Sequence, residues 1–413
     1  MKRDGNIIPE IIDYGNMSES FDQVLRGTVR KTCREGRELL ARREEVIANL
    51  QREIADGSFK VTEYREREIY EYGKHRILQI VPMERRIGCH AIMRVVDRHL
   101  HRRFIRTTGA SIVGRGTHDL MSQVREALHD NPHLRYAYQF DIVHFYDNVN
   151  HQLAKDAYAH VFKDKTLLHI LGNLIELLPQ GISFGLRPSQ ATGNLILSIH
   201  LDHPLKDGMG VRHFFRYCDD GLVLAETKAE LWVIRDAIHE MLEDIGFQVK
   251  RNERIYPVTE GIDFVGYVIY PDHVRLRKRI KKKFAAKIKE VKSRKGWHYP
   301  GYHWAITEDG KKTQLMTEEQ PSNGVKGYNG YAINVAWMGG ISNTGKAIDN
   351  RTDAQKQSLR ELLTELKHRY PDAKILGHRD ISPDKNHNGV VDPWERIKEC
   401  PCFDAITEYA DIK

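Results

Sequence analysis

Two adjacent carboxylates, Asp219 and Asp220, carry the strongest chemical signal in this sequence. They lie between the apolar runs 213–216 and 221–225, a pattern that predicts a β-hairpin with Tyr-Cys-Asp-Asp at its tip. Paired carboxylates in such a place repel each other and lose hydration unless a divalent cation neutralises them. Asp141 ends another strand-like run, and one carboxylate on each of two neighbouring strands is what a two-magnesium phosphoryl-transfer site requires. A lone Asp-Asp pair is more often a solvated turn, so the prediction depends on Asp141 and on the motifs between them.

The composition is that of a globular protein with more than one domain. At 413 residues the chain is long for a single core, so two or three domains are expected. No apolar run is long enough to span a bilayer, and the first residues contain no apolar signal-peptide segment. The five cysteines are scattered, which fits a reducing compartment rather than a disulfide framework, and we therefore expect a cytoplasmic protein.

A hairpin pattern over residues 64–82 places cations ahead of the carboxylates. Its residues alternate around a Gly-Lys turn, and it carries Lys74 and Arg76. Fixed cations of this kind clamp a nucleoside triphosphate, although both side chains are equally compatible with an ordinary charged surface. Tyr146 lies five residues after Asp141, where its ring would either lie under the sugar of an incoming nucleotide or pack the strand–helix turn.

A loop-to-helix junction follows around Gly185. The glycine permits a close backbone approach, and Ser189 is a good N-cap for an apolar helix starting at Ala191. Such a junction, including Gln190, supports a base pair or a template strand.

Two further elements follow the Asp-Asp pair. Residues 262–269 have the pattern of a single strand, and residues 275–295 form a basic helix with one apolar stripe. In isolation the helix is equally well explained as a solvated face. Beside a polymerase-like site, its charge favours contact with a phosphate backbone.

Taken in order, these segments resemble a bacterial retroelement reverse transcriptase over roughly residues 60–290. The resemblance implies the fingers and palm of a right-hand polymerase, with Asp141, Asp219 and Asp220 binding Mg²⁺ or Mn²⁺. It also implies an RNA template, a DNA primer and deoxynucleoside triphosphates as partners, with a basic accessory protein as a further candidate. The matching segments are Phe140-Asp141 with Phe145-Tyr146-Asp147, Gly185-x-x-x-Ser189-Gln190, Tyr217-Cys218-Asp219-Asp220 and Asp263-Phe264-Val265-Gly266-Tyr267.

The second of these segments is similar to one subfamily in particular. Most retroelement polymerases carry Ser-Pro where this chain has Ser189-Gln190. The Gly-x-x-x-Ser-Gln version resembles polymerases of diversity-generating retroelements, which copy a template RNA with errors at adenines. Phe184 departs from the small aliphatic residue that usually precedes the glycine.

The last part of the chain has a different character. The pattern predicts a strand over residues 301–306, an amphipathic helix over 352–370 and a strand over 374–380 that ends near His378. His378 and Cys400 are two candidate zinc ligands, although a lone His and a Cys-Pro-Cys are more often structural.

Over roughly residues 294–413 the chain resembles a zinc-dependent N-acetylmuramoyl-L-alanine amidase of the phage-lysozyme type. Carried over residue by residue, the resemblance implies that His378 and Cys400 bind Zn²⁺. It implies that Tyr302 and Lys398 assist the zinc-bound water and stabilise the tetrahedral intermediate during peptidoglycan cleavage. The matching segments are Gly301-Tyr302-His303, Gly339-Gly340-Ile341, Gly377-His378-Arg379-Asp380 and Lys398-x-Cys400-Pro401-x-Phe403-Asp404.

Both regions lack part of their family's pattern at the point where they join. The amidase family carries another zinc-binding His about 35 residues before the Gly-Tyr-His, but that stretch here belongs to the polymerase, which leaves two ligands where three are normal. His298 is the nearest substitute. The polymerase family has several thumb helices, and here one basic helix stands in their place. A deletion that fused two neighbouring genes, or an assembly error, explains both losses better than a purposeful two-domain architecture.

We therefore expect an α+β chain. Its predicted parts are an N-terminal helical segment (1–60), reverse transcriptase fingers and palm with a shortened, thumb-like basic helix (61–291), and an α/β amidase-like domain lacking its first strand (292–413).

A calcium-type loop lies between the two candidate zinc ligands. Residues 384–395 fit the pattern D-x-[DN]-x-[DN]-G-x5-E without a mismatch. Flanking helices are not evident, so the pattern predicts a calcium loop outside an EF-hand, and an Asn/Gly-rich turn is the alternative. The oxygen ligands would come from Asp384, Asn386, Asn388, the Val390 carbonyl, Asp392 and Glu395.

Three hypotheses remain open. The first is an RNA-directed DNA polymerase with an impaired amidase-like domain. The second is a cell-wall hydrolase with a passenger polymerase fragment, and the third is a nucleic-acid-binding fusion without turnover. The complete set of three palm carboxylates favours the first, and the missing His weighs against the second. If the amidase were active, peptidoglycan would be a further partner, as expected of a protein from a prophage.

Overall fold

The computed structural model describes residues 3–71, 74–295, 300–342 and 346–412. The chain divides into two compact units, Met1–Lys281 and Lys282–Lys413. The border falls inside helix α12 (Lys278–Lys295). Among the residues described, no helix combines the length and the apolar character that a membrane crossing requires.

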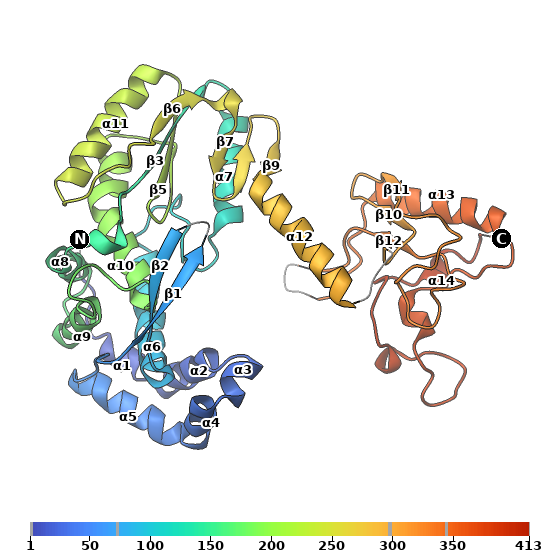
Figure 1. Ribbon diagram of the computed structural model, residues 1–413, viewed down its shortest axis with the longest axis horizontal. Helices are drawn as coiled ribbons and strands as arrows, with labels where there is room; N and C mark the ends of the chain where they lie inside the picture. The colour runs from blue at the N-terminus through green and yellow to red at the C-terminus, as the bar shows by residue number, and fades with distance from the viewer. Residues whose placement is uncertain (1–2, 72–73, 296–299, 343–345, 413) are drawn as a thin grey trace. The chain divides into compact units, whose positions relative to one another are not determined.

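A bundle of helices forms the first part of unit 1. Its central helix is α6 (Met83–His101), whose side chains are buried along most of its length. The surrounding helices begin at residue 8 and lie together at one end of the unit (Figure 1). They are α1 (Ile8–Ile11), α2 (Tyr14–Val24), α3 (Thr28–Thr32), α4 (Arg34–Ala41) and α5 (Arg43–Asp56).

A four-stranded antiparallel sheet forms the centre of unit 1. Its strands follow the order β4-β5-β3-β6. The predicted Asp-Asp hairpin is present, because β4 and β5 pair directly and leave a two-residue turn between them. The strands are β3 (Tyr136–Asp141), β4 (Phe214–Tyr217), β5 (Asp220–Ala225) and β6 (Arg254–Pro257).

The two faces of this sheet are buried against different helices. Alternation along β3 sends Tyr138 and Phe140 to one face and Ala137 to the other, as the twofold period of a strand requires. The first face packs against α11 (Lys228–Glu243) and the second against α7 (Thr117–Asp130).

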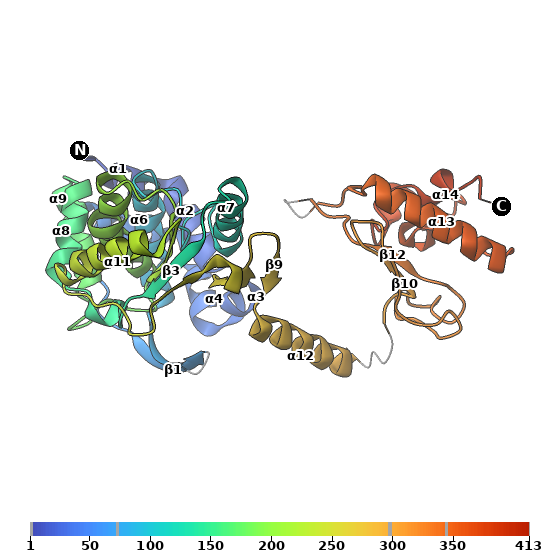
Figure 2. The same cartoon turned by 90° about the horizontal axis from the view of Figure 1, so that it is seen from above.

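Three further helices complete this core. Figure 2 shows α8 (His151–Val161) and α9 (Lys165–Ile175) next to each other, and α10 (Arg187–Leu197) packs against both. The chain continues from α10 through two short π-helices, η2 (Ser198–Asp202) and η3 (Pro204–Gly208). Earlier in the chain, a short 3-10 helix, η1 (Tyr146–Asn148), follows β3.

The start of α10 differs from the prediction. The helix begins at Arg187, its N-cap is Leu186, and Ser189 lies inside the first turn. Pro188 explains the shift, because proline is favoured in the first helical turn, where its missing N–H costs no intrahelical hydrogen bond. The expected N-cap role of Ser189 was therefore wrong.

Two smaller β structures flank the central sheet. The predicted hairpin over residues 64–82 is present as β1 (Arg65–Glu71) and β2 (Lys74–Ile80). Residues 262–269 form a hairpin rather than one strand, because Val265 and Gly266 both have positive φ, 45° and 93°, and reverse the chain. Its strands β7 (Ile262–Phe264) and β8 (Tyr267–Ile269) continue into β9 (Val274–Leu276).

Unit 2 has a three-stranded sheet with the order β11-β10-β12, in which β10 and β12 are parallel. Helix α13 (Asp353–Arg369) covers it through Leu359 and Leu362, which share a small core with Ile306. The other elements are β10 (Trp304–Ile306), β11 (Lys312–Gln314), β12 (Val335–Trp337), the 3-10 turns η5 (His378–Ile381) and η6 (Pro393–Glu395), and α14 (Ala405–Glu408).

The strand predicted over residues 374–380 is not formed. Residues 374–377 have no regular structure, and η5 follows them directly. A strand needs a hydrogen-bonding neighbour. In the described part of unit 2, no strand pairs with this segment.

Candidate functional site

The carboxylates of unit 1 are brought together by strand pairing. The register of β3 and β5 places Asp141 opposite Asp220, and Asp219 lies in the turn that begins β5. The Asp219 carboxyl faces that of Asp141. Burial, together with the negative charge of Asp141, raises the pKa of Asp219 to about 6. The fold therefore brings the carboxyls of Asp141 and Asp219 face to face and places Asp220 at the register position opposite Asp141, but in the described structure the three do not converge as one group.

Asp141 has one oxygen engaged and one free. Its Oδ2 atom forms an ion pair with Lys250, whose backbone N–H also donates to the Asp141 carbonyl at 2.8 Å. Its Oδ1 atom is buried and has no hydrogen-bond partner in the described structure. Lys250 reaches the site because Val249 forms a bridge with Ile142 at the end of β3. Nothing in the local sequence singled it out.

The donor set at this site is suited to a hard divalent cation. Asp141 and Asp219 supply carboxylate oxygens, and the buried, unpartnered Oδ1 atom leaves a lone pair without compensation. Mg²⁺ binds through one or two carboxylates together with substrate phosphates, so the residues fit the ion that the sequence predicts.

Tyr146 lies directly beside the β4–β5 hairpin. Its hydroxyl contacts Cys218. Burial, followed by the nearby Cys218 and Asp219, raises the pKa of Tyr146. Its ring packs against Phe184 with centroids 4.8 Å apart, and the Arg76 guanidinium lies 5.6 Å from the Phe184 ring centroid. Arg76, Phe184 and Tyr146 thus form one stack at the edge of the carboxylate site.

The remaining predicted nucleotide-site residues are distributed around this stack. A side-chain atom on Gly185 would overlap the Gln79 carbonyl oxygen, so the close approach made possible by this glycine is to strand β2. Ser189 is buried, whereas Gln190 is exposed and contacts the Ser111 hydroxyl. The side chain of Lys74 lies outside the described residues.

In unit 2, three of the predicted amidase residues line one cavity. Tyr302, His378 and Cys400 border a space of about 660 Å³ with a mostly aromatic and aliphatic wall. Burial lowers the pKa of His378, and the positive charge of Lys398 acts in the same direction. Burial raises the pKa of Tyr302, helped by Cys400. The four side chains therefore gather at one place.

These residues do not complete a zinc site. Within the described structure, no three or more His, Cys, Asp and Glu side chains are grouped to hold a metal ion. His303 is buried and uses both ring nitrogens. Its Nε2 is hydrogen-bonded to the Gln320 carbonyl, and its Nδ1 accepts from the Asn334 N–H. His298, the substitute considered from the sequence, lies outside the described residues.

The predicted calcium loop closes on itself. Glu395 is 1% exposed, and its carboxylate accepts from the backbone N–H groups of Lys385, Asn386 and Asp392. Asp384 Oδ2 accepts from the Gly389 N–H at 2.8 Å, whereas its Oδ1 is buried without a partner in the described structure.

The amides inside this loop point at one carboxylate. Asn386 and Asn388 donate to Asp392 Oδ2 at 2.9 and 3.2 Å. The Val390 N–H donates to Asn388 Oδ1. The predicted ligands are thus neighbours, although their acidic members do not converge as a group of three.

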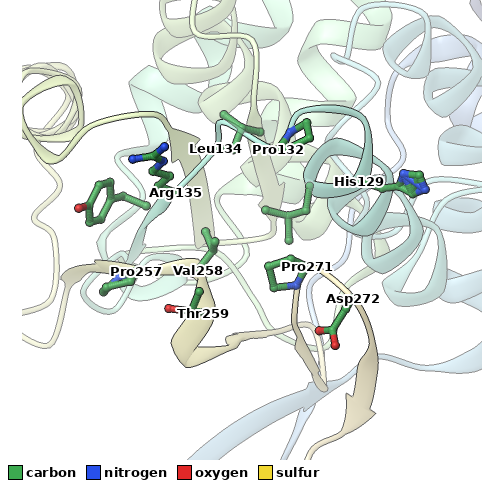
Figure 3. Close-up of a pocket in the computed structure, with 11 residues that line it drawn as sticks. His129, Pro132, Leu134, Arg135, Pro257, Val258, Thr259, Pro271 and Asp272 are labelled. Carbon is green, nitrogen blue, oxygen red and sulfur yellow. The ribbon is translucent and has the colours of Figure 1, made fainter.

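A cavity of about 660 Å³ lies at the other end of β3, next to Tyr136 (Figure 3). Prolines and aliphatic side chains form most of its described lining, and Asp272 is the one carboxylate there. It therefore lacks the paired acidic groups of the Asp141 site.

Two family descriptions match this chain. Reverse transcriptase (RNA-dependent DNA polymerase) matches residues 71–269, and N-acetylmuramoyl-L-alanine amidase matches residues 275–394. The first match contains Asp141, Asp219 and Asp220. The second contains Tyr302 and His378 and ends before Lys398 and Cys400.

Two phage relatives agree with the second match. The endolysins of Klebsiella phage KP32 and Escherichia phage T7 are each 35% identical over 117 residues of the C-terminal region, covering 28% of this chain and 68% of each relative. An uncharacterized protein of Haemophilus influenzae is 50% identical over 80 residues, 19% of this chain and 69% of that protein.

Among solved structures, apo telomerase from Candida tropicalis aligns with a TM-score of 0.43 and 13% identity over 56% of this chain and 53% of that one. A score of this size carries no functional argument. The family and endolysin matches do, and they show that this chain joins a reverse transcriptase domain, from a nucleotidyltransferase family, to an N-acetylmuramoyl-L-alanine amidase domain related to phage endolysins.

Proposed function

We propose that unit 1 is an active RNA-directed DNA polymerase. The observation that carries this proposal is the facing of Asp141 and Asp219 across adjacent strands, with a buried carboxylate oxygen left unpartnered. Extension of a DNA primer on an RNA template with Mg²⁺ or Mn²⁺ tests it directly.

In this proposal the central sheet is the palm and the β1–β2 hairpin belongs to the fingers. Asp141 and Asp219 would hold the metal ions, and Asp220 would support them from the register position opposite Asp141. Bound divalent ions would orient the primer end and the triphosphate and neutralise charge that develops during transfer. Lys250 holds one oxygen of Asp141 and keeps its carboxylate oriented toward Asp219.

The Arg76–Phe184–Tyr146 stack supports a nucleotide-binding role at the edge of this site. Packing on Phe184 holds the Tyr146 ring in place, and an aromatic ring there excludes a ribose 2′-hydroxyl by steric contact. Arg76, with Lys74, supplies cations for the triphosphate.

Helix α12 supports contact with a nucleic acid backbone. Its apolar stripe is open, with Phe284 67% exposed and Ile280 and Ile288 also exposed, and lysines surround it. We propose that this helix stands in for the thumb, with its lysines following phosphates and its apolar stripe available to bases.

We further propose that the polymerase belongs to the diversity-generating type. On this basis, errors are expected to concentrate opposite template adenines, and Gln190→Pro is expected to reduce them. Sequencing of the extension products measures the effect. Because a proline at this point of α10 removes a backbone donor, Gln190→Ala is the second variant, and Gln152→Ala, at an exposed position of α8, is the matched control. Errors spread evenly over all four template bases would return the polymerase to the general retroelement class.

A second proposal concerns the loop at residues 384–395, which we infer to bind Ca²⁺. Its support is the buried, unpartnered Asp384 Oδ1 atom within a complete calcium-type pattern. Zn²⁺ is not proposed for the same residues, because their donors are all oxygen.

Calcium is expected to stabilise unit 2 against heat. At a hundredfold excess over its dissociation constant, the ion adds about 2.7 kcal/mol to the free energy of unfolding. Asp384→Asn should abolish most of this gain, because it keeps an acceptor for Gly389 and removes the charge. Differential scanning calorimetry with Ca²⁺ or EDTA measures it, with Asp372→Asn as an exposed control in the same unit. Equal stabilisation of the Asp384 variant would identify the segment as an ordinary turn.

A further inference from the structure

A buried ion pair lies beneath the catalytic hairpin. The side chain of Arg216, in β4, is 1% exposed, and that of Asp202, at the end of η2, is 0% exposed. The pair is bidentate, because Arg216 Nε donates to Asp202 Oδ1 at 2.7 Å and Nη2 donates to Oδ2 at 2.6 Å. Thr108 adds a third hydrogen bond to Asp202 Oδ2 at 3.1 Å. Burying two unlike charges this deeply costs free energy of hydration, and only good pairing geometry with further hydrogen bonds offsets that cost.

The same guanidinium also holds the turn of the hairpin. Arg216 Nη1 donates to the Cys218 carbonyl at 2.7 Å and to Asn194 Oδ1 at 3.1 Å. Asn194 is itself fixed on α10, where its amide donates to the Ala110 carbonyl at 2.9 Å. The Cys218 carbonyl is therefore tied, through the Arg216 side chain, to Asp202 and Asn194, and through these two residues to Thr108 and Ala110.

The backbone around Arg216 reinforces this connection. Its N–H donates to the Thr107 carbonyl, and its carbonyl accepts from the Gly109 N–H, both at 3.0 Å. Cys218 has a φ of 54°, in the left-handed region that a residue with a side chain adopts at a cost. A turn in that conformation relaxes unless something holds it, and Asp219 is the next residue.

We infer that Arg216 and Asp202 are a positioning pair whose task is to fix the Cys218 turn so that Asp219 faces Asp141. The inference rests on the proposed polymerase function. Neither residue is one of the candidate metal ligands, and Arg216 meets the hairpin at the Cys218 carbonyl rather than at a carboxylate. Loss of the pair should leave substrate binding intact and misplace one metal-binding carboxylate.

The first test separates turnover from binding. Arg216→Lys keeps the positive charge and loses the planar fork, and Asp202→Asn keeps the size of the partner and loses its charge. Each is expected to lower the rate of single-nucleotide extension by about 10²-fold, the usual effect of misplacing a reacting group by about 1 Å. The KM for the nucleotide should change less than threefold. Arg85→Lys, which alters the half-buried ion pair with Glu53 elsewhere in unit 1, is the control and should keep both constants.

A second variant distinguishes positioning from a purely structural role. Arg216→Met combined with Asp202→Leu replaces the charges with apolar groups of similar size, which often restores stability to a buried site. The double variant is expected to regain the melting temperature that either single change loses, while its extension rate stays low. Recovery of rate together with stability would overturn the inference.

A third measurement does not depend on activity. Hydrogen exchange followed by mass spectrometry should show faster exchange over residues 217–220 in the double variant, with unchanged protection over α6. If the unaltered protein extends no primer, the polymerase proposal fails, and this exchange result still decides the inference. Unchanged exchange in the hairpin would show that the pair does not hold the turn.

Discussion

Asp219→Asn is expected to abolish primer extension almost completely, with a loss of roughly 10³- to 10⁴-fold in rate. The substitution keeps the size of the side chain and removes one of the two charges that face each other at the ends of β3 and β5. Without that charge, bound metal ions would have one anionic ligand fewer, and negative charge that develops during transfer would be compensated less well. Single-turnover extension of a labelled DNA primer on an RNA template measures the loss directly.

The same variant carries its own control for folding. The pKa of Asp219 is raised to about 6, so the folded protein favours the protonated carboxyl. The stability that this protonated group contributes is present at low pH and is lost as the pH rises through about 6. At pH 8 in EDTA, the buried carboxylate of Asp219 is ionised and repels that of Asp141. Asp219→Asn removes this repulsion and should raise the free energy of unfolding by about 1–3 kcal/mol. At pH 4.5 the two proteins should differ little.

A variant that is more stable and inactive cannot be explained by misfolding. Thermal unfolding at both pH values supplies the measurement, and Asp147→Asn, an exposed carboxylate in the turn after β3, is the matched control for charge removal. Extension at an undiminished rate by the Asp219 variant would remove the polymerase proposal altogether.

The parts of this site that follow from local pattern could be predicted from the sequence. Two apolar runs flanking a short polar tip fix a hairpin, and strand alternation places Asp141 at the end of β3. Once β3 and β5 pair, their register places Asp141 directly opposite Asp220. The hairpin at residues 64–82 followed from the same alternation.

The parts that were missed depend on contacts between distant segments. Lys250 and Asp141 are 109 residues apart, and nothing in the intervening sequence indicates that a bridge at Val249 brings them together. Arg216 adjoins the Tyr-Cys-Asp-Asp motif, yet its burial depends on Asp202 in a helix whose apolar pattern does not distinguish a core carboxylate from an exposed one.

Two errors had simpler causes. Ser189 looked like an N-cap, but Pro188 favours an earlier start of α10, whose N-cap is Leu186. Residues 374–377 have the composition of a strand, and strand formation also depends on a neighbour that the local sequence does not specify.

Unit 2 is expected to show little or no peptidoglycan hydrolysis, even with added Zn²⁺. His378 and Cys400 lie on one cavity with Tyr302, and Lys398 acts on the same histidine. A catalytic zinc ion needs three protein ligands and an open position for water. In the described part of the chain no third donor joins these two. An ion with two ligands is held weakly, so its bound water is not fixed against the scissile amide.

Zymography on purified cell walls measures this, with a phage endolysin of the matched family as the positive control. Zn²⁺ binding should be weak by titration, and His378→Ala should change it little. Clearing equal to that of the intact endolysin would contradict the expectation, and His298→Ala would then tell whether that residue supplies the third ligand. If the His298→Ala variant also cleared the cell walls, another residue of the chain would have to supply the third zinc ligand, and the site would hold more than the two ligands His378 and Cys400.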